Sequence, residues 1–217
     1  MRFKDRIHAG QLLAQALAKY RSQDAVIYAL PRGGVVLAEV IAKALNLPLS
    51  LIVVRKIGHP LNPEYAVCAL SEQSGLICNE PELASIEKDW LETAVAQELQ
   101  EIKRRSKLYL GNKPPIVAKG KIAIIVDDGI ATGLTMMAAI AEIKRQHPKK
   151  IVVAVPIAAR QSVKEIEPMV DKFVALEVPA QYLGSVGSYY EYFPQVRDGE
   201  VVNIIRQQTT KPGVGNL

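Results

Sequence analysis

Short continuous runs of apolar residues alternate with amphipathic stretches along most of the chain. Apolar runs without polar alternation predict strands covered on both faces, as in a parallel sheet. We expect such strands at residues 25–30, 51–54, 122–126, 151–155 and 173–176. Apolar residues at helical spacing predict helices over residues 9–20, 35–45, 134–144 and 162–167, with Asp5 as the cap of the first. Strand, crossover helix and parallel strand form a repeating unit. The pattern therefore predicts an α/β fold with a central, mostly parallel sheet and helices on both faces.

The alternation breaks between the second strand and residue 121. Residues 58–63 contain one Gly and two Pro and predict irregular structure. Residues 65–70 and 75–78 flank four polar residues and predict a small hairpin. A long helix follows, with an apolar stripe from Ile86 to Ile102 and basic residues at its end, an order that complements the helix dipole. We interpret the basic run as a solvated helix end rather than a nucleic-acid patch.

These elements predict a single domain over residues 1–217. We expect its core at about residues 25–177, with a hairpin and long helix inserted at about 65–110. The aromatic-rich residues at about 178–200 have weak periodicity and predict an irregular lobe, and residues 209–217 predict a frayed end.

Composition narrows the classes of protein only slightly. The chain has 217 residues, 49% hydrophobic and 23% charged, which is enough to form a core without disulfides or metals. The formal net charge of +5 suits either an anionic ligand or nucleic acid. Cys68 and Cys78 lack CxxC spacing and are expected to be packing residues. The three histidines lack the spacing of a zinc site. Without an apolar run that could span a bilayer or a signal-peptide core, the chain is predicted to be cytoplasmic, with no membrane contact.

Two adjacent carboxylates, Asp127 and Asp128, directly follow the apolar run 122–126. Anions at the end of a buried strand must face solvent or a ligand, and the carboxyl ends of parallel strands are where open α/β sheets bind ligands. The loop that follows consists of Gly129, Ile130, Ala131, Thr132 and Gly133. Its small residues let backbone amides converge at the start of a helix, and Thr132 together with Thr135 in that helix supplies two hydroxyls. A phosphate cradle beside two acceptors suited to a vicinal diol predicts a site for a 5-phosphorylated ribose.

The string Val126-Asp127-Asp128-Gly129-Ile130-Ala131-Thr132-Gly133 resembles the phosphoribosyl-pyrophosphate signature of the type I phosphoribosyltransferases. Walker A, dinucleotide and nucleophile-elbow motifs are absent. The resemblance implies that Asp127 and Asp128 hold the ribose 2- and 3-hydroxyls and that residues 129–135 bind the 5-phosphate. It also implies the type I fold, with residues 178–200 as a hood over the base, and a homodimer. The implied cofactor is Mg²⁺, bound through the substrate, with Asp127 and Asp128 as candidate ligands.

Two other segments fit the same resemblance. Pro31-Arg32-Gly33-Gly34 is similar to the family's pyrophosphate loop, although taken alone it would be interpreted as a plain turn. Its glycines permit close backbone approach, and Arg32 can bind a phosphate with two hydrogen bonds. The resemblance implies a cis non-proline peptide near Pro31–Arg32. Arg55 and Lys56 follow the second strand at the same edge of the sheet, where their charges could also reach pyrophosphate.

Residues 58–66 are a candidate mobile lid over an oxocarbenium-like centre. Glu64, within this segment, is a candidate general base toward an incoming amine; the alternative is a solvated loop charge. The candidate catalytic residues are therefore Asp128, Arg32, Lys56 and Glu64.

The predicted function is transfer of a 5-phosphoribosyl group from phosphoribosyl pyrophosphate to a nitrogenous base, with release of pyrophosphate, as in nucleotide salvage. Ala131 stands where relatives that use 6-oxopurines carry an acid, which disfavours such a base and leaves adenine, uracil, orotate or an unassigned base. The candidate residues to stack on the base are Tyr182, Tyr189, Tyr190, Tyr192 and Phe193. The alternative is a non-catalytic regulator that senses phosphoribosyl pyrophosphate and binds nucleic acid, although no nucleic-acid-binding signature is visible.

Overall fold

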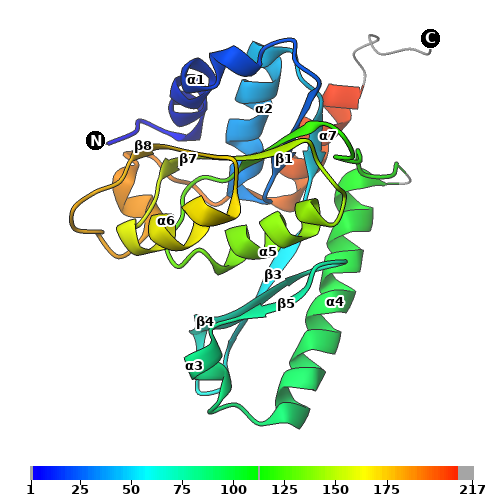
Figure 1. Ribbon diagram of the computed structural model, residues 1–217, viewed down its shortest axis with the longest axis vertical. Coiled ribbons are helices and arrows are strands. Elements are labelled where there is room, and N and C mark those ends of the chain that lie inside the picture. Colours follow the sequence, from blue (N-terminus) through cyan, green and yellow to red (C-terminus); the bar gives the residue numbers. More distant parts are fainter. Residues whose placement is uncertain (1, 112, 210–217) are drawn as a thin grey trace.

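The computed structural model describes residues 2–111 and 113–209, and Figure 1 shows its layers. Five parallel strands form the main sheet, in the order β2-β1-β6-β7-β8. They are β1 (Ala25–Ala29), β2 (Leu49–Leu51), β6 (Ile122–Val126), β7 (Lys150–Ile157) and β8 (Lys172–Glu177). The predicted α/β fold with a parallel sheet is confirmed.

Helices cover both faces of the main sheet, as Figure 1 shows. One face carries α1 (Arg6–Ala16), α2 (Gly33–Leu45) and α7 (Asp198–Thr209), and the other carries α5 (Leu134–Lys144) and α6 (Arg160–Ile166). The short 3-10 helices are η1 (Ala18–Tyr20), η2 (Glu167–Met169) and η3 (Val186–Tyr189). Alternate residues of a strand point to opposite faces, so Ile27 of β1 packs in one core and Tyr28 in the other. Burial on both faces explains why the strands are continuous apolar runs.

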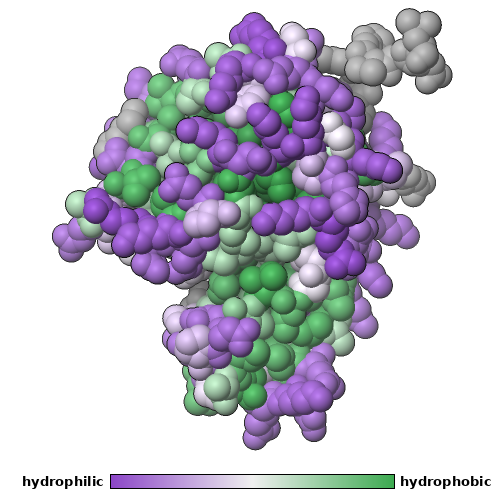
Figure 2. All heavy atoms as spheres, in the orientation of Figure 1, coloured by the Kyte–Doolittle hydropathy of each residue, from purple (hydrophilic) through white to green (hydrophobic). Residues whose placement is uncertain are grey.

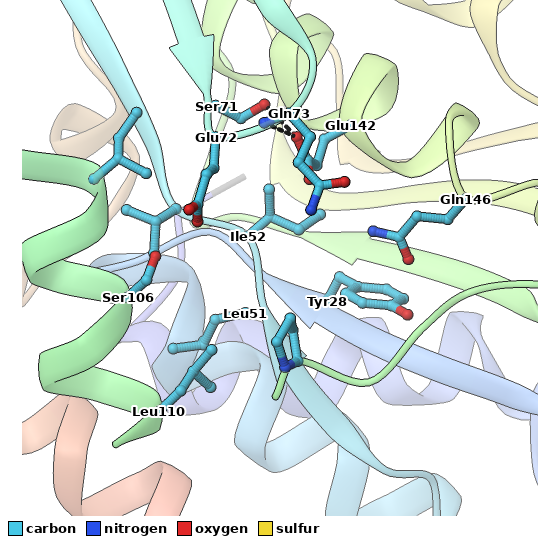
Figure 3. A pocket seen from close by; sticks show the side chains of 13 residues that line it. Tyr28, Leu51, Ile52, Ser71, Glu72, Gln73, Ser106, Leu110, Glu142 and Gln146 are labelled. Carbon is cyan, nitrogen blue, oxygen red and sulfur yellow. Dashed lines mark hydrogen bonds between the residues drawn. The ribbon is translucent and has the colours of Figure 1, made fainter. Parts of the chain in front are cut away.

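A second, antiparallel sheet lies below the main sheet in Figure 1. It contains β3 (Val54–His59), β4 (Asn62–Ser71) and β5 (Gly75–Cys78), and it is followed by α3 (Glu80–Leu83) and α4 (Lys88–Leu110). We call residues 54–110 the small-sheet unit. Its β4–β5 turn is fixed to α5, because the Ser71 hydroxyl and the Gln73 amide donate to the buried Glu142 carboxylate at 2.7 and 2.9 Å (Figure 3).

Residues 58–63 form a hairpin, so the prediction of irregular structure there is wrong. β3 and β4 pair as far as His59 and Asn62, with register shifts on both sides of Gly58. A side chain on Gly58 would lie 2.1 Å from the Pro63 carbonyl oxygen, so glycine permits the close crossing of the strands. Pro63 precedes the part of β4 that pairs with β5, so its missing amide hydrogen costs the sheet nothing on that side.

Cys68 and Cys78 form a disulfide, so the expectation that they are only packing residues is wrong. The predicted hairpin is confirmed, and its register, with Ser71 opposite Gly75, places Cys68 directly opposite Cys78.

Helix α7 was not predicted. It has a short apolar stripe, of which Val201 and Ile205 are buried one turn apart, and it packs against α2 and α4. Its first residues fall in the segment that was expected to be irregular. The predicted frayed end, apart from Thr209, lies outside the described residues. Within residues 2–111 and 113–209, no helix is long and apolar enough to cross a membrane.

Candidate active site

The loop between β6 and α5 ends in a helix start that can receive an anion. Gly133 caps α5 with φ 84°, a left-handed conformation that favours glycine. Backbone hydrogen bonds from Ile130 to Ile157 and from Ala159 to Ile130 fix the loop to the end of β7. The first hydrogen bond within the helix runs from Met137 N to Gly133 O at 2.9 Å, so the amides before it belong to the free N-terminal turn.

A hollow of about 180 Å³ lies at this loop. It is lined by Lys56, Asp127, Asp128, Gly129, Ile130, Ala131, Thr132, Gly133, Thr135, Met136 and Val186. The buried Thr135 Oγ1 has no hydrogen-bond partner among the described residues. A buried hydroxyl without a partner is costly, so this atom fits a ligand that would accept its hydrogen bond.

The two acids each use one carboxylate oxygen within the protein. Asp127 Oδ1 accepts a hydrogen bond from the Asp128 amide at 2.8 Å, and Asp128 Oδ2 accepts one from Arg6 Nε at 2.9 Å. No hydrogen bond from the described residues reaches the second oxygen of either acid. Each acid is thus held in place and keeps one oxygen for a ligand.

Burial also changes the protonation of these acids. It raises the pKa of Asp127 well above its ordinary value, and the neighbouring Asp128 carboxylate raises it further. Burial raises the pKa of Asp128 as well, while the guanidinium of Arg6 opposes that rise. Perturbed carboxylates beside a hollow are a mark of functional sites.

The two glycines at the start of α2 pack directly against the acids, and neither lines the hollow. A Cβ on Gly33 would lie 1.7 Å from Asp128 Oδ2, and a Cβ on Gly34 would lie 2.8 Å from the Val126 carbonyl oxygen. The peptide between Pro31 and Arg32 is cis, as expected. Arg32 does not line the hollow; its Nη1 is 3.6 Å from Asp198 Oδ1 of α7.

Arg55 and Lys56 lie on opposite faces of β3, because successive side chains of a strand alternate. Lys56 lines the hollow. Arg55 instead forms an ion pair with Glu98 of α4, its Nε 2.6 Å from Glu98 Oε2. The structure therefore brings only Lys56 of this pair to the site.

Glu64 lies in β4, and its side chain is outside the described part of the structure. The predicted lid of residues 58–66 is the β3–β4 hairpin described above, with Leu61 at its tip 89% exposed. Nothing in this arrangement tests Glu64 as a base.

Sequence reasoning missed Arg6, the residue that pairs with Asp128. Its guanidinium carbon lies 3.7 Å from the centre of the Phe193 ring, and its Nη1 donates to the Pro194 carbonyl at 2.7 Å. Arg6 is 8% exposed. It stands at the start of an amphipathic helix far from the motif in sequence, where a basic residue carries no local signal of function.

The hood aromatics divide into different roles. The Tyr190 hydroxyl donates to the Asp128 carbonyl at 2.7 Å, and Phe193 stacks on Arg6, the partner of the Asp128 side chain, so both help to hold Asp128 in place. Tyr189 is buried and Tyr192 is 67% exposed. The buried Tyr182 hydroxyl has no hydrogen-bond partner in the part of the chain that is described.

A second hollow, shown in Figure 3, lies between the small-sheet unit and the main sheet. Tyr28, Ser106, Glu142 and Gln146 are among its lining residues, and none of the predicted site residues is. The Glu142 carboxylate there is already hydrogen bonded to the β4–β5 turn. This hollow is part of the joint between the two sheets.

Known proteins resemble this chain over most of its length. Residues 4–183 match the model of the phosphoribosyl transferase domain family. The Mycobacterium tuberculosis proteins MT0597 and Rv0571c, named as phosphoribosyl transferases with no substrate given, are each 38% identical to it over 202 residues. These residues are 92% of this chain and 45% of each relative, so the chain spans about half the length of the curated relatives it matches.

Solved structures share the fold of this chain. The crystal structure of TT1426 from Thermus thermophilus is 38% identical and has a TM-score of 0.80, covering 96% of this chain and 99% of that one. The structure of AQ2163 from Aquifex aeolicus, 15% identical with a TM-score of 0.50, covers 80% and 74% of the two chains and shares the fold. With the family match extending over residues 4–183, this chain belongs to the phosphoribosyl transferase domain family.

Proposed function

We propose that this chain transfers a 5-phosphoribosyl group from phosphoribosyl pyrophosphate to a nitrogenous base and releases pyrophosphate. The observation that carries the proposal is the hollow at the end of β6. Two carboxylates, each with one oxygen left over, share it with the unpartnered Thr135 hydroxyl and the N-terminal turn of α5. These groups are complementary to a sugar phosphate. The carboxylates can accept hydrogen bonds from the sugar hydroxyls, and the amides at the helix start can donate hydrogen bonds to the phosphate oxygens.

Each part of the substrate has a candidate partner. Residues 129–135 would bind the 5-phosphate, and Asp127 and Asp128 would accept hydrogen bonds from the ribose hydroxyls. Gly33 and Gly34 pack against these acids, and their backbone would bind the pyrophosphate beside the ribose. Lys56 would add positive charge where the leaving group becomes more negative, which lowers the barrier electrostatically.

The acids also fit a magnesium ion that comes with the substrate. The described residues contain no group of three or more His, Cys, Asp or Glu side chains that could hold a metal. Mg²⁺ commonly binds through one or two carboxylates together with substrate phosphates and water, so Asp127 and Asp128 are sufficient as protein ligands. When bound, the ion would neutralise charge on the pyrophosphate.

The identity of the base is part of the proposal. Ala131 supplies no acid, which disfavours a 6-oxopurine and leaves adenine, uracil, orotate or another base. Tyr182, whose buried hydroxyl has no hydrogen-bond partner among the described residues, is one candidate hood residue to contact the base. A role in nucleotide salvage and a homodimer complete the proposal.

Release of pyrophosphate from Mg²⁺ and phosphoribosyl pyrophosphate, measured with a panel of free bases, tests this function. We expect turnover with one base class. Asp127→Asn should weaken phosphoribosyl pyrophosphate binding about tenfold or more, since it removes a charged acceptor. Asp24→Asn is the control, because Asp24 is 72% exposed, pairs with Lys121 and does not line the hollow.

A second matched pair tests the placement of the basic residues. Lys56→Met should weaken binding about tenfold, and Arg55→Met should change it less than about threefold. Equal effects would contradict the assignment of Lys56. A chain that binds phosphoribosyl pyrophosphate, turns over no base and is retained on nucleic acid would instead be the regulator.

A further inference from the structure

We propose that Arg6 is a positioning residue of this site: it orients the Asp128 carboxylate for the ribose and ties it to the hood, residues 178–200. The inference rests on the proposed function, because it gives Arg6 a part in binding phosphoribosyl pyrophosphate. Arg6 lies on α1, 122 residues from Asp128 in sequence.

Three contacts fix the plane of the Arg6 guanidinium. Nε donates to Asp128 Oδ2 at 2.9 Å, Nη1 donates to the Pro194 carbonyl at 2.7 Å, and the group stacks on the Phe193 ring at 3.7 Å. A planar, stacked guanidinium is much more strongly directed than a lysine ammonium would be. Asp128 Oδ2 is bound to Arg6 and lies against Gly33, so Oδ1 is the oxygen that Asp128 can offer to a ligand in the hollow.

The Arg6–Asp128 contact is also shielded from solvent. Arg6 Nε lies 2.9 Å from Asp128 Oδ2, and the two side chains are only 9% and 16% exposed. Loss of Arg6 would therefore free the carboxylate to rotate and leave a buried charge without its partner.

The hood is connected to Asp128 through this residue and its neighbours. Backbone hydrogen bonds join Phe3 to Tyr189 and Glu191, so the segment before α1 pairs with the hood. The Tyr190 hydroxyl then donates to the Asp128 carbonyl, while Arg6 holds the side chain of the same residue. The position of the hood and the orientation of the acid are thus set by one group of contacts.

The test measures binding of Mg²⁺–phosphoribosyl pyrophosphate and of Mg²⁺–pyrophosphate to Arg6→Met, Arg6→Lys and the wild type by calorimetry. Arg21→Met, at an exposed arginine, is the control. We expect Arg6→Met to weaken phosphoribosyl pyrophosphate binding about thirtyfold and pyrophosphate binding less than about threefold, because only the former contains the ribose hydroxyls. Arg6→Lys should bind phosphoribosyl pyrophosphate with an affinity between those of Arg6→Met and the wild type, since lysine keeps the positive charge without the planar guanidinium.

The comparison of the two ligands separates positioning from a merely structural role. Equal loss of both ligands, or unchanged phosphoribosyl pyrophosphate binding in Arg6→Met, would overturn the inference while leaving the proposed function intact. Wild-type protein that binds no phosphoribosyl pyrophosphate would overturn both. If Arg6→Met fails to fold, Arg6→Lys and Phe193→Leu decide, and unchanged binding in both would count against Arg6.

Discussion

The main sheet and the small-sheet unit are built in different ways. All five residues of β1 and all five of β6 are buried, so these strands are held by packing on two faces. Among the described side chains of the small-sheet unit, β4 is buried only from Val67 to Ser71, β3 buries only Ile57, and β5 buries no residue. Helix α4 buries only Ile102 and Tyr109 among its 23 residues. Figure 2 shows hydrophobic residues gathered on the surface of this lower part.

This difference indicates how the site is supported. The two acids and the loop of residues 129–133 follow β6, in the centre of the densely packed sheet, where neighbouring strands leave little freedom. Lys56 comes from the more weakly packed unit. We therefore expect binding of the ribose phosphate to depend on the main sheet, and the small-sheet unit to tolerate more change.

The largest contrast should appear in core truncations. Ile124→Ala removes a fully buried side chain of β6 and should lower the free energy of unfolding by about 3 kcal/mol. Leu99→Ala, at a partly exposed position of α4, should cost only about 1 kcal/mol. Urea unfolding of both variants measures the two values. Similar losses would mean that the two parts are equally packed.

Gly33→Ala should strongly weaken binding. Its Cβ would collide with Asp128 Oδ2 and displace the acid from Arg6, so phosphoribosyl pyrophosphate affinity should fall about a hundredfold, or roughly 2.7 kcal/mol. Gly199→Ala, where a Cβ meets nothing within 4 Å, is the matched control and should bind as the wild type does. Calorimetric titration distinguishes them, and equal affinities would contradict the close packing of the two loops.

Removal of the disulfide should act on the small-sheet unit. Cys68→Ala together with Cys78→Ala opens a short loop and should cost about 2 kcal/mol. We expect hydrogen exchange to quicken in β4 and β5 and to stay unchanged in β6. Two free thiols titrated in the folded, unreduced protein would show that the bond is not formed.

Asp127→Asn should stabilise the protein while it weakens the site. Because the native pKa of Asp127 is raised, the native state holds this proton more tightly than the unfolded chain does. Stability is therefore lost as pH rises from the unfolded pKa of about 3.9 through the native value. Above that range the variant should be more stable than the wild type, and the advantage should shrink toward about pH 4. Thermal unfolding across pH measures this, and a constant difference would contradict it.

The sequence was sufficient to predict the main sheet and its acidic loop, because their signals are local. A strand buried on both faces is an apolar run, and β6 and α5 begin and end where the pattern predicted. The half-exposed small-sheet unit gave weaker signals. There, two prolines and a glycine were interpreted as irregular, although the glycine serves a strand crossing and Pro63 lies beyond the pairing with β5.

The remaining failures concern contacts between distant residues. The Cys68–Cys78 pairing depends on the exact hairpin register. The predicted strand ends at residues 70 and 75 would place Cys68 opposite Ile77, whereas the observed turn pairs Ser71 with Gly75 and brings Cys78 opposite Cys68. The separation of Arg55 from Lys56 follows from strand alternation once β3 is known to start at Val54. The partnership of Arg6 with Asp128 had no such signal, since it depends on how α1 is placed over the sheet.

The contact between α1 and the end of β6 affects how members of this family should be sorted. Searches for the acidic string alone would group together chains that keep an arginine at the start of the first helix and chains that have lost it. If that arginine is needed, the second group would retain a recognisable signature and bind the sugar poorly. The first few residues of a relative would then be as informative about its competence as the string itself.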